Sequence, residues 1–481
     1  MKKFLSTISI PHVFIFLSGI ILFCSILTYI VPSGSYERTT KIYNQIEQTV
    51  IVPGSYHEIP KHFSLKGLIL GANVEGEASP TSLLGLFSSI PKGMNQAAAL
   101  IFFVFIIGAV FNVIQHTGTV NVFVFKLLKK FKNSPVLLTF ILYTAFALAG
   151  TFLGMGAEFI PLIPILLILS KEMGYDRLFG VSILLIPEGI GWSTAITNPF
   201  TVQIAQQIAE LPIGSGMILR IVMFLICFVV GFVFLMLYGK KVKKDRSKSI
   251  MPDDEFILDE DVQLVDTPFT KRHFWIAFTS LVLFGLILFA VQTMGWGLIE
   301  MTGGFFTVGF LTILISGMSG EESMEAFIKG LQIMIVPALI VGFARGIQVV
   351  LQEGQVIDTI LFHAASALQK MPTPVAAEGM YFFQTLLNFF IPSASGQAMV
   401  SMPLMVPLAD LLGITRQTAV LAFISGDGFS NMIIPTNGVL MAILGIALVP
   451  FEKWFKYIFP LFIILSVIAA VFLIVAVIIN Y

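Results

Sequence analysis

The chain has 481 residues, of which 56% are hydrophobic and 12% charged, and its formal net charge is zero. A soluble domain has about 45–50% apolar and about 25% charged residues, so most of this chain's surface must face hydrocarbon. The balanced charge gives no reason to expect a nucleic acid partner. The two cysteines, Cys24 and Cys227, lie in apolar runs, where neither a disulfide framework nor a metal site has support.

The first apolar runs alternate with basic clusters. Runs at 11–31 and 97–115 can each span a bilayer, and the first lacks a cleavage pattern, so it is expected to remain as an uncleaved helix. Basic clusters follow at 126–132 and 240–248. Because short cytoplasmic loops are rich in Lys and Arg, we expect a cytoplasmic N-terminus in a multi-pass protein of a bacterial-type inner membrane.

Residues 135–170 contain two apolar pieces around the sequence GMGAE. The second piece is about 12 residues long and too short to cross alone, because a spanning helix needs at least about 17 residues. We therefore predict a re-entrant hairpin, although a complete span over 135–153 is an alternative. A broken helix is predicted at 181–209, interrupted at Thr197-Asn198-Pro199, before 217–238 returns to the cytoplasm.

The second half of the chain mirrors the first. A cytoplasmic linker and a connecting transmembrane helix occupy 239–302, and 303–481 holds a hairpin at 375–412 and a broken helix at 419–449. Together with a first repeat at 1–238, this predicts an all-α integral membrane protein with two inverted-topology repeats. We expect about nine full crossings plus two re-entrant hairpins.

The repeat is visible as a shift of 239 residues. The shift places Glu188-Gly189 on Asp427-Gly428 and Thr197-Asn198 on Thr436-Asn437, and it sets GMGAE (154–158) on SASGQ (393–397). Small residues, a Thr-Asn pair and an acid are typical of discontinuous membrane helices, which form the binding sites of secondary transporters.

A helix that stops inside a bilayer leaves backbone N–H and C=O groups without partners. Side-chain oxygens of the two Thr-Asn pairs could add to the free carbonyls and form a site for Na⁺, while free N–H groups could hold a substrate carboxylate. The alternative is that each Thr-Asn pair only caps a kinked helix. The predicted substrate-binding residues are Gly154, Gly156, Glu158, Thr197, Asn198, Arg345, Ser393, Ser395, Gln397, Thr436 and Asn437.

Charged residues inside these segments are few and therefore informative. Glu188, Asp427, Asn198 and Asn437 are the predicted ion-coupling residues, with Na⁺ or H⁺ as the coupled ion. Glu188 could instead be a packing or proton-relay group. Arg345 could grip a substrate carboxylate or neutralise Glu158 or Asp427 as a structural ion pair. His116, Trp192 and Asn388 are weaker candidates for the pocket, and Glu378 is expected near the membrane interface.

No nucleotide-binding loop, Cys/His metal spacing or nucleophile elbow is present in the sequence. Transport must then draw on a solute or ion gradient, and no cofactor is expected. A channel would need no inverted repeats, and an integral-membrane enzyme would need a catalytic cluster, whereas the six histidines are scattered. These observations favour a secondary transporter over both alternatives.

Three motifs carry a resemblance to a known family. GTFLGMGAE (150–158), GYDRLFGVSILL (174–185) and TNPF (197–200) are similar to the anaerobic C4-dicarboxylate carrier family, and most similar to its YfcC-like branch of basic amino acid antiporters. The resemblance covers nearly the whole chain. It implies membership of the ion transporter superfamily, with two inverted repeats and a homodimer. The branch often carries two adjacent acids after GMG, whereas here Ala157 precedes a single acid, Glu158.

Substrate charge remains open between two alternatives. Three acids against one arginine near the expected site favour a basic amino acid such as arginine or ornithine, because a buried dianion would be repelled by carboxylates. Protonation of Glu158 or Asp427 would remove that repulsion, so a C4-dicarboxylate such as succinate or fumarate is the alternative substrate. In both cases the sequence predicts an antiporter or an ion-coupled symporter.

Overall fold

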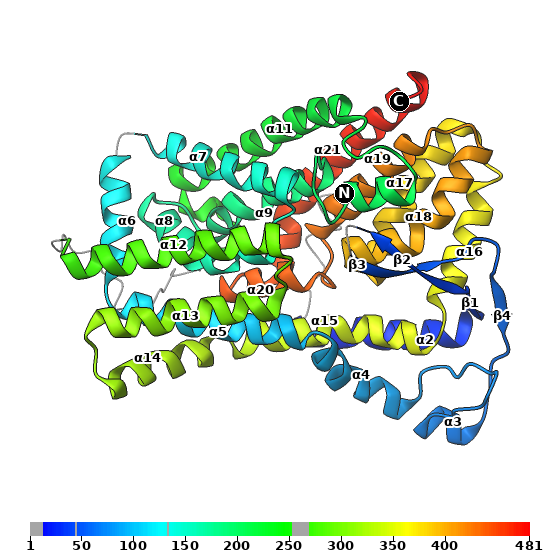
Figure 1. Cartoon of the computed structure of the whole chain (residues 1–481), viewed down its shortest axis with the longest axis horizontal. Helices are drawn as coiled ribbons and strands as arrows, with labels where there is room; N and C mark the ends of the chain where they lie inside the picture. Colours follow the sequence, from blue (N-terminus) through cyan, green and yellow to red (C-terminus); the bar gives the residue numbers. More distant parts are fainter. Residues whose placement is uncertain (1–12, 44–45, 132–133, 253–268) are drawn as a thin grey trace.

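The computed structural model describes residues 13–43, 46–131, 134–252 and 269–481, and the chain is mostly helical (Figure 1). The first half comprises α2 Val13–Ile30, β1 Ser33–Ser35, β2 Arg38–Tyr43, β3 Ile46–Ile51, β4 His57–Ile59, α3 Leu65–Leu70, α4 Leu83–Gln96, α5 Ala98–His116, α6 Thr119–Lys130, α7 Pro135–Leu148, the π-helix η1 Ala149–Leu153, the 3₁₀ helix η2 Ala157–Leu162, α8 Ile163–Glu172, α9 Arg177–Ser193, α10 Val202–Ile208, α11 Met217–Lys244 and the 3₁₀ helix η3 Arg246–Lys248. The second half comprises α12 Lys271–Met294, α13 Leu298–Ser316, α14 Gly320–Ile333, α15 Ile335–Glu353, α16 Ile357–Leu368, α17 Thr373–Phe390, α18 Ala394–Leu411, α19 Arg416–Asn431, α20 Gly438–Ile446 and α21 Phe451–Ile478. Most of the linker between α11 and α12, including its acidic run at 253–255, lies outside the described residues.

Four short strands lie between α2 and α3, where the all-α expectation is wrong. β1 pairs antiparallel with β4, and β2 pairs antiparallel with β3, with Arg38 opposite Ile51. The sequences RTTKIY and IEQTVI are rich in Thr, Ile, Val and Tyr, the residue types that favour strands. This signal was available in the sequence.

Asp358 in the first turn of α16 anchors these strands. Its buried carboxylate accepts hydrogen bonds from the Tyr36 backbone N–H at 2.9 Å and from the Arg38 guanidinium at 2.9 and 3.0 Å. The Tyr56 ring stacks on Phe362 of α16 with 4.1 Å between the ring centroids. The strands are therefore fixed to the second half of the chain.

Seven helical segments of the described chain are long and apolar enough to cross a membrane, namely Ala98–His116, Pro135–Leu153, Met217–Lys244, Lys271–Ala290, Leu298–Ser316, Gly320–Glu353 and Phe451–Ile478. Six of them coincide with expected crossings. Pro135–Leu153 is the first arm of the expected hairpin, and its length also fits the alternative of a complete span. The remaining expected crossings are α2 and the two broken helices, so the total of about nine stays a prediction.

The predicted breaks both interrupt helices. α9 ends at Ser193 and α10 begins at Val202, while α19 ends at Asn431 and α20 begins at Gly438. The expected hairpin 375–412 consists of α17 and α18, which are joined at 391–393. The expected hairpin 135–170 consists of α7 and α8, with η1 and η2 around Gly154.

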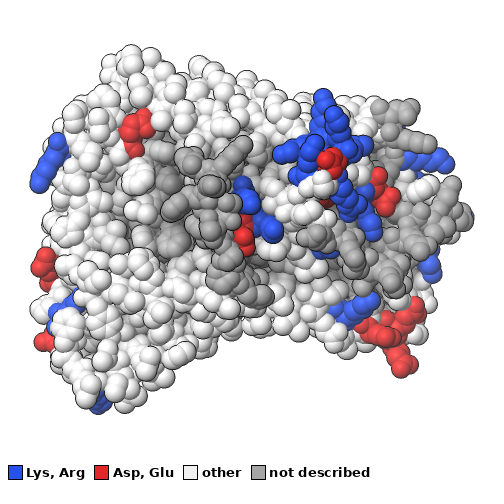
Figure 2. Space-filling view, turned by 180° about the vertical axis from the view of Figure 1, so that it is seen from behind, with Lys and Arg blue, Asp and Glu red and all other residues white. Residues whose placement is uncertain are grey.

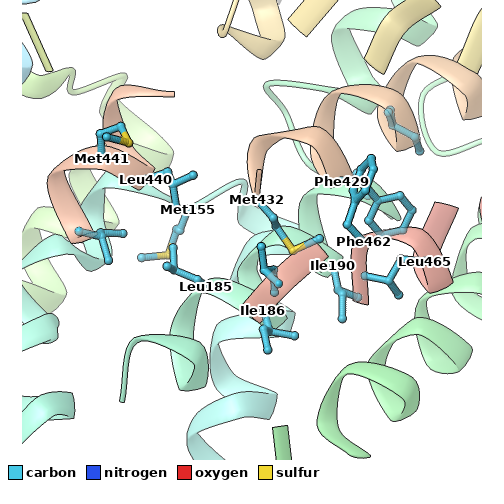
Figure 3. Close-up of a cluster of buried hydrophobic side chains, with 14 of the residues drawn as sticks. Met155, Leu185, Ile186, Ile190, Phe429, Met432, Leu440, Met441, Phe462 and Leu465 are labelled. Carbon is cyan, nitrogen blue, oxygen red and sulfur yellow. The ribbon is translucent and has the colours of Figure 1, made fainter. Parts of the chain in front are cut away.

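The two broken helices cross at glycines. A methyl group on Gly428 of α19 would lie 2.4 Å from the backbone N and Cα of Ser193 in α9, and one on Gly189 of α9 would lie 2.5 Å from Met432 Cγ. Figure 3 shows Met432 beside Ile186 and Ile190 of α9, within a cluster of buried apolar side chains. The crossing is therefore close enough that only glycine fits at these two positions.

A second close crossing joins the long helices. A methyl group on Gly93 of α4 would lie 2.6 Å from the backbone of Gly346 in α15. One on Gly330 of α14 would lie 2.5 Å from Ala109 Cα in α5. Consequently α4–α5 and α14–α15 pack against each other along their whole length.

Basic residues gather at one end of the molecule. The last turn of α11 carries Lys241, Lys243 and Lys244, and η3 adds Arg246 and Lys248. Figure 2 shows the Lys and Arg side chains of the rear face concentrated mainly towards one end.

Gly428→Ala tests the crossing of the broken helices. The added methyl group meets backbone atoms that cannot rotate away, so we expect a loss of about 1–3 kcal/mol in unfolding free energy. Thermal unfolding of the purified protein should show a lower melting temperature. Gly285→Ala is the matched control, because nothing lies within 4 Å of a methyl group there. Equal melting temperatures for the two variants would contradict the crossing.

Candidate functional site

The first break is held against the first hairpin by Thr151 and Asn198. Ile196 N–H donates to Thr151 Oγ1 at 3.1 Å, and Thr151 Oγ1 donates to the Thr194 carbonyl at 3.3 Å. The buried Asn198 side chain donates from Nδ2 to the Gly150 carbonyl at 3.2 Å and accepts at Oδ1 from Phe200 N–H at 2.8 Å. These bonds satisfy part of the backbone that the break leaves free.

Gly154 makes this contact possible. Its φ is +67°, a conformation that L side chains rarely adopt, and a methyl group there would lie 2.4 Å from Asn198 Oδ1. The first hairpin tip and the first break are therefore in direct contact. Thr197, the other predicted residue, donates from Oγ1 to the Phe152 carbonyl at 3.2 Å.

The second break is organised by Asn437. Its Oδ1 accepts from Val439 N–H at 3.0 Å and from Leu440 N–H at 3.2 Å, which caps α20. Its Nδ2 donates to Asn431 Oδ1 at 3.0 Å, across the break. The hydroxyl oxygen of Thr436 is buried and has no hydrogen-bond partner among the described residues. Both predicted asparagines thus use Oδ1 as a backbone acceptor.

Three acids lie around the breaks. Glu188 lies near the end of α9, where a methyl group on Gly156 would be 3.3 Å from its Oε1. Glu158 Oε2 accepts from Gly156 N–H at 2.7 Å. Glu158 and Asp427 both lie close enough to Glu188 for like-charge repulsion. Gly154 and Gly156 at the first hairpin tip therefore lie in the same region as the three acids.

Asp427 is the most enclosed of the three acids. It is 0% exposed, its Oδ1 accepts from Asn431 Nδ2 at 3.4 Å, and its Oδ2 has no partner within the described chain. Among the described residues, the recorded ion pairs join no lysine or arginine to Glu158, Glu188 or Asp427. The region therefore carries carboxylates without a compensating cation.

The second hairpin tip presents polar, uncharged groups. Ser393 Oγ caps α18 by accepting from Gly396 N–H at 3.4 Å, and Ser395 is partly buried in the first turn of the same helix. Gln397 is fully buried and donates to Gln384 Oε1 at 2.7 Å, while its own Oε1 has no partner in the described structure. Gln384 is not among the predicted site residues, because in the sequence it lies within a mostly apolar helix.

Arg345 lies apart from the acids. Its guanidinium donates to Gln348 Oε1 on the same helix, and within the described residues no ion pair with Glu158 or Asp427 is recorded. Its side chain is half-buried on α15. The structure therefore brings the acids together but does not bring Arg345 to them.

Of the weaker candidates for the pocket, Asn388 and Trp192 lie near the site and His116 does not. Asn388 Nδ2 donates to the Asp427 carbonyl at 2.9 Å and to Asn431 Oδ1 at 3.0 Å, and Trp192 Nε1 donates to the Met155 carbonyl at 2.9 Å. His116 instead pairs with Glu322 on the surface at 3.2 Å. Asn431 is a site residue that the sequence analysis missed, although it stands six residues before Asn437.

No group of three or more His, Cys, Asp or Glu side chains that could hold a metal ion occurs in the described ranges.

Comparisons with known proteins give one family. The profile of the DcuC family, C4-dicarboxylate anaerobic carriers, matches residues 10–478. A curated relative from Escherichia coli (strain K12) is 32% identical over 472 residues, covering 93% of this chain and 92% of that protein. Its name, YfcC, comes with a provisional description as a basic amino acid antiporter. An uncharacterized protein from Haemophilus influenzae is 28% identical and covers 98% of this chain and 97% of its own length.

One solved structure covers almost the whole chain at low similarity. The YdaH transporter of Alcanivorax borkumensis aligns with a TM-score of 0.42 and 16% identity, covering 98% of this chain and 99% of its own.

Asn437→Ala tests the cap of α20. The substitution removes the acceptor for two backbone N–H groups, and loss of an N-cap costs about 0.5–2 kcal/mol. We expect a lower melting temperature with monodisperse protein retained. Asn437→Asp keeps the acceptor and should retain most of the stability; a melting temperature as low as that of the alanine variant would contradict the capping role.

Proposed function

The chain belongs to the C4-dicarboxylate anaerobic carrier family and is a membrane transporter, and from its site we propose a secondary active transporter for a small carboxylate-bearing metabolite. The favoured substrate is a basic amino acid such as arginine or ornithine, and the transport is antiport or ion-coupled symport. The family and its relatives carry solutes and give no support to an enzyme.

The observation that carries the choice of substrate is the group of three acids. Glu158 and Asp427 each lie within electrostatic reach of Glu188, and no basic side chain among the described residues pairs with any of the three. Buried like charges are costly unless a cation or protons join them. A substrate with a cationic side chain would neutralise the group, and H⁺ or Na⁺ could do so when the substrate is absent.

We further propose that the chain consists of two inverted repeats, and reciprocal contacts support this. Under the shift of 239 residues Gly189 corresponds to Gly428 and Ser193 to Met432, and the contacts are Gly189 with Met432 and Gly428 with Ser193. Exchanging the two halves of the chain converts each of these contacts into the other. Such pairs of contacts are typical of a two-fold axis.

The long helices have the same reciprocity. A shift of 237 residues relates Gly93 to Gly330 and Ala109 to Gly346, and the contacts are Gly93 with Gly346 and Gly330 with Ala109.

Two arginines extend the pattern to the ends of the broken helices. Arg177, the first residue of α9, donates to the carbonyl of Ala447, the C-cap of α20, at 3.2 Å. Arg416, the first residue of α19, donates to the carbonyl of Ala209, the C-cap of α10, at 3.0 Å. Each cation lies at a helix C-terminus, where it is stabilising. Each broken helix therefore begins where the other ends, as inverted repeats require.

The membrane orientation, the coupling-ion site and the substrate contacts at the second hairpin tip are also proposed. The basic end of α11 faces the cytoplasm, so the N-terminus is cytoplasmic and the protein spans the bacterial inner membrane. A homodimer is proposed from the resemblance to the family alone. Asn198 and Asn437 hold the breaks open, leaving backbone carbonyls and the Thr436 hydroxyl as ligands for a coupling Na⁺. The Ser393, Ser395 and Gln397 side chains contact the substrate at the second tip.

A C4-dicarboxylate is the second candidate substrate, because the family is described by that activity and Arg345 offers a cation to a carboxylate. Protonation of the acids would admit a dianion. The two candidates require opposite roles for the acids.

Counterflow in proteoliposomes separates the two candidates. Vesicles are loaded with unlabelled arginine, ornithine, succinate or fumarate, and labelled arginine or labelled succinate is added outside. We expect labelled arginine to accumulate only against a basic amino acid. Accumulation of succinate against dicarboxylates would support the alternative, and no accumulation of either label would reject both substrate classes.

Asn198→Ala and Asn437→Ala test the breaks as parts of the transport site. Each should abolish counterflow while folded protein remains in the membrane, because the break loses the side chain that fixes its backbone. Thr307→Ala is a suitable control, since the exposed Thr307 hydroxyl donates to the Gly303 carbonyl within α13 and touches neither break. Near-normal counterflow by both asparagine variants would remove the breaks from the site.

A further inference from the structure

A cavity of about 560 Å³ lies beside the second hairpin tip. Its walls come from the end of α15, the start of α16, the tip residues Ile391 and Gly396, and the strands after α2. Polar side chains supply half of its lining: Ser35, Arg38, Thr49, Gln348, Gln352 and Gln355, with Asp358 beside them. On the proposed topology this cavity opens on the outer side of the membrane.

A polar stripe on α15 leads from this cavity towards the second break. Arg345, Gln348 and Gln352 follow the spacing i, i+3, i+7 and therefore share one face of the helix. Gln348 and Gln352 line the cavity, and Arg345 donates to Gln348. Val341, one turn earlier, lies against Gly438, where a methyl group would be 3.4 Å from Val341 Cγ1. Arg345 therefore lies between the cavity and the Asn437 break.

The charge of Arg345 has no acidic partner in the part of the chain that is described. Gln348 is the one hydrogen-bond partner recorded for its half-buried guanidinium. Arg38, which lines the cavity itself, is already engaged with Asp358 at 2.9 Å and with the Tyr36 carbonyl at 3.0 Å. A half-buried guanidinium with only one neutral partner is suited to accept a carboxylate bidentately.

The repeat-related position in the first half of the chain is apolar rather than polar. The shift of 237 residues sets Arg345 and Gln348 on Gly108 and Phe111. Phe111 lines an apolar cavity of about 410 Å³ whose other walls include Pro161, which the shift of 239 residues sets on Val400 of the outer cavity. The two cavities thus occupy corresponding positions, and only the outer one carries a cation and amides.

We propose that Arg345, Gln348 and Gln352 form an access site that receives the carboxylate of the incoming substrate in the outer cavity and passes it to the Asn437 break. This inference rests on the proposed transport of a carboxylate-bearing metabolite and adds where, and from which side, the carboxylate is held. The acids around Glu188 then receive the cationic end of the same molecule. Among the described residues, the corresponding inner cavity is lined mainly by apolar side chains and offers no such site.

The test uses proteoliposomes of known protein orientation, with labelled arginine and with agmatine, which lacks the carboxylate, as a competitor. Arg345→Gln should raise the KM for arginine added to the outer face about tenfold or more, because a hydrogen bond to a charged group is worth about 1.5–3 kcal/mol. Its maximal rate, its KM from the inner face and its inhibition by agmatine should change little. Lys66→Gln is the matched control, since Lys66 is an exposed cation that does not line the cavity.

An unchanged outer KM for Arg345→Gln, with wild-type counterflow intact, would overturn the access site and leave the proposed function standing. If Arg345→Gln is not monodisperse, Gln348→Leu decides: an outer KM raised severalfold supports the site, and a KM equal to that of the wild type overturns it. If the wild type exchanges succinate instead, the same comparison is made with succinate against succinamate. Absence of any counterflow by the wild type would reject the proposed function itself.

Discussion

The structure depends on the close crossing of two interrupted helices. In hydrocarbon, a helix end leaves N–H and C=O groups whose exposure costs several kcal/mol each, so both breaks must lie inside protein. α9 and α19 meet at Gly428 and Ser193, closely enough that their backbones nearly touch. Because each break is then buried in protein, side chains of the same half, such as Thr151 and Asn198 at the first break and Asn437 at the second, can satisfy the free backbone groups. Removing the crossing would expose both ends at once.

The same crossing explains why the acids lie together. Glu188 and Asp427 each precede a glycine of the crossing, so the packing that joins Gly189 to Met432 and Gly428 to Ser193 also brings the two carboxylates to one region. Apolar side chains, among them Ile186, Ile190 and Met432, surround this region (Figure 3). Carboxylates in such surroundings interact strongly with any cation that enters, which makes the region suitable for binding and unsuitable as a merely structural ion-pair network.

Much of this could be predicted from the sequence, because the decisive residues are of unusual types for a membrane helix. The Thr-Asn pairs and the small-residue tips mark positions where a helix is interrupted, and the acids Glu188 and Asp427 stand shortly before these interruptions, inside α9 and α19. Contacts between distant segments could not be predicted in the same way. Arg345 is isolated in the sequence, and nothing there shows that its partner is Gln348 on its own helix rather than Glu158 or Asp427. The strands at 33–59 depart from the all-α prediction, although their β-branched residues favour strands.

In a carrier built from the inverted repeats proposed above, the two backbones must be alike but the two cavity surfaces need not be. The reciprocal glycine contacts keep the two halves alike where they pack, whereas the corresponding cavities diverge, with Gln348 lining one and Phe111 lining the other. Backbone symmetry allows the two conformations of alternating access to have similar energy. Divergent cavity walls allow the two sides to bind the substrate with different strength. A carboxylate held only at the outer cavity would favour loading from outside, while the symmetric core leaves the exchange itself reversible.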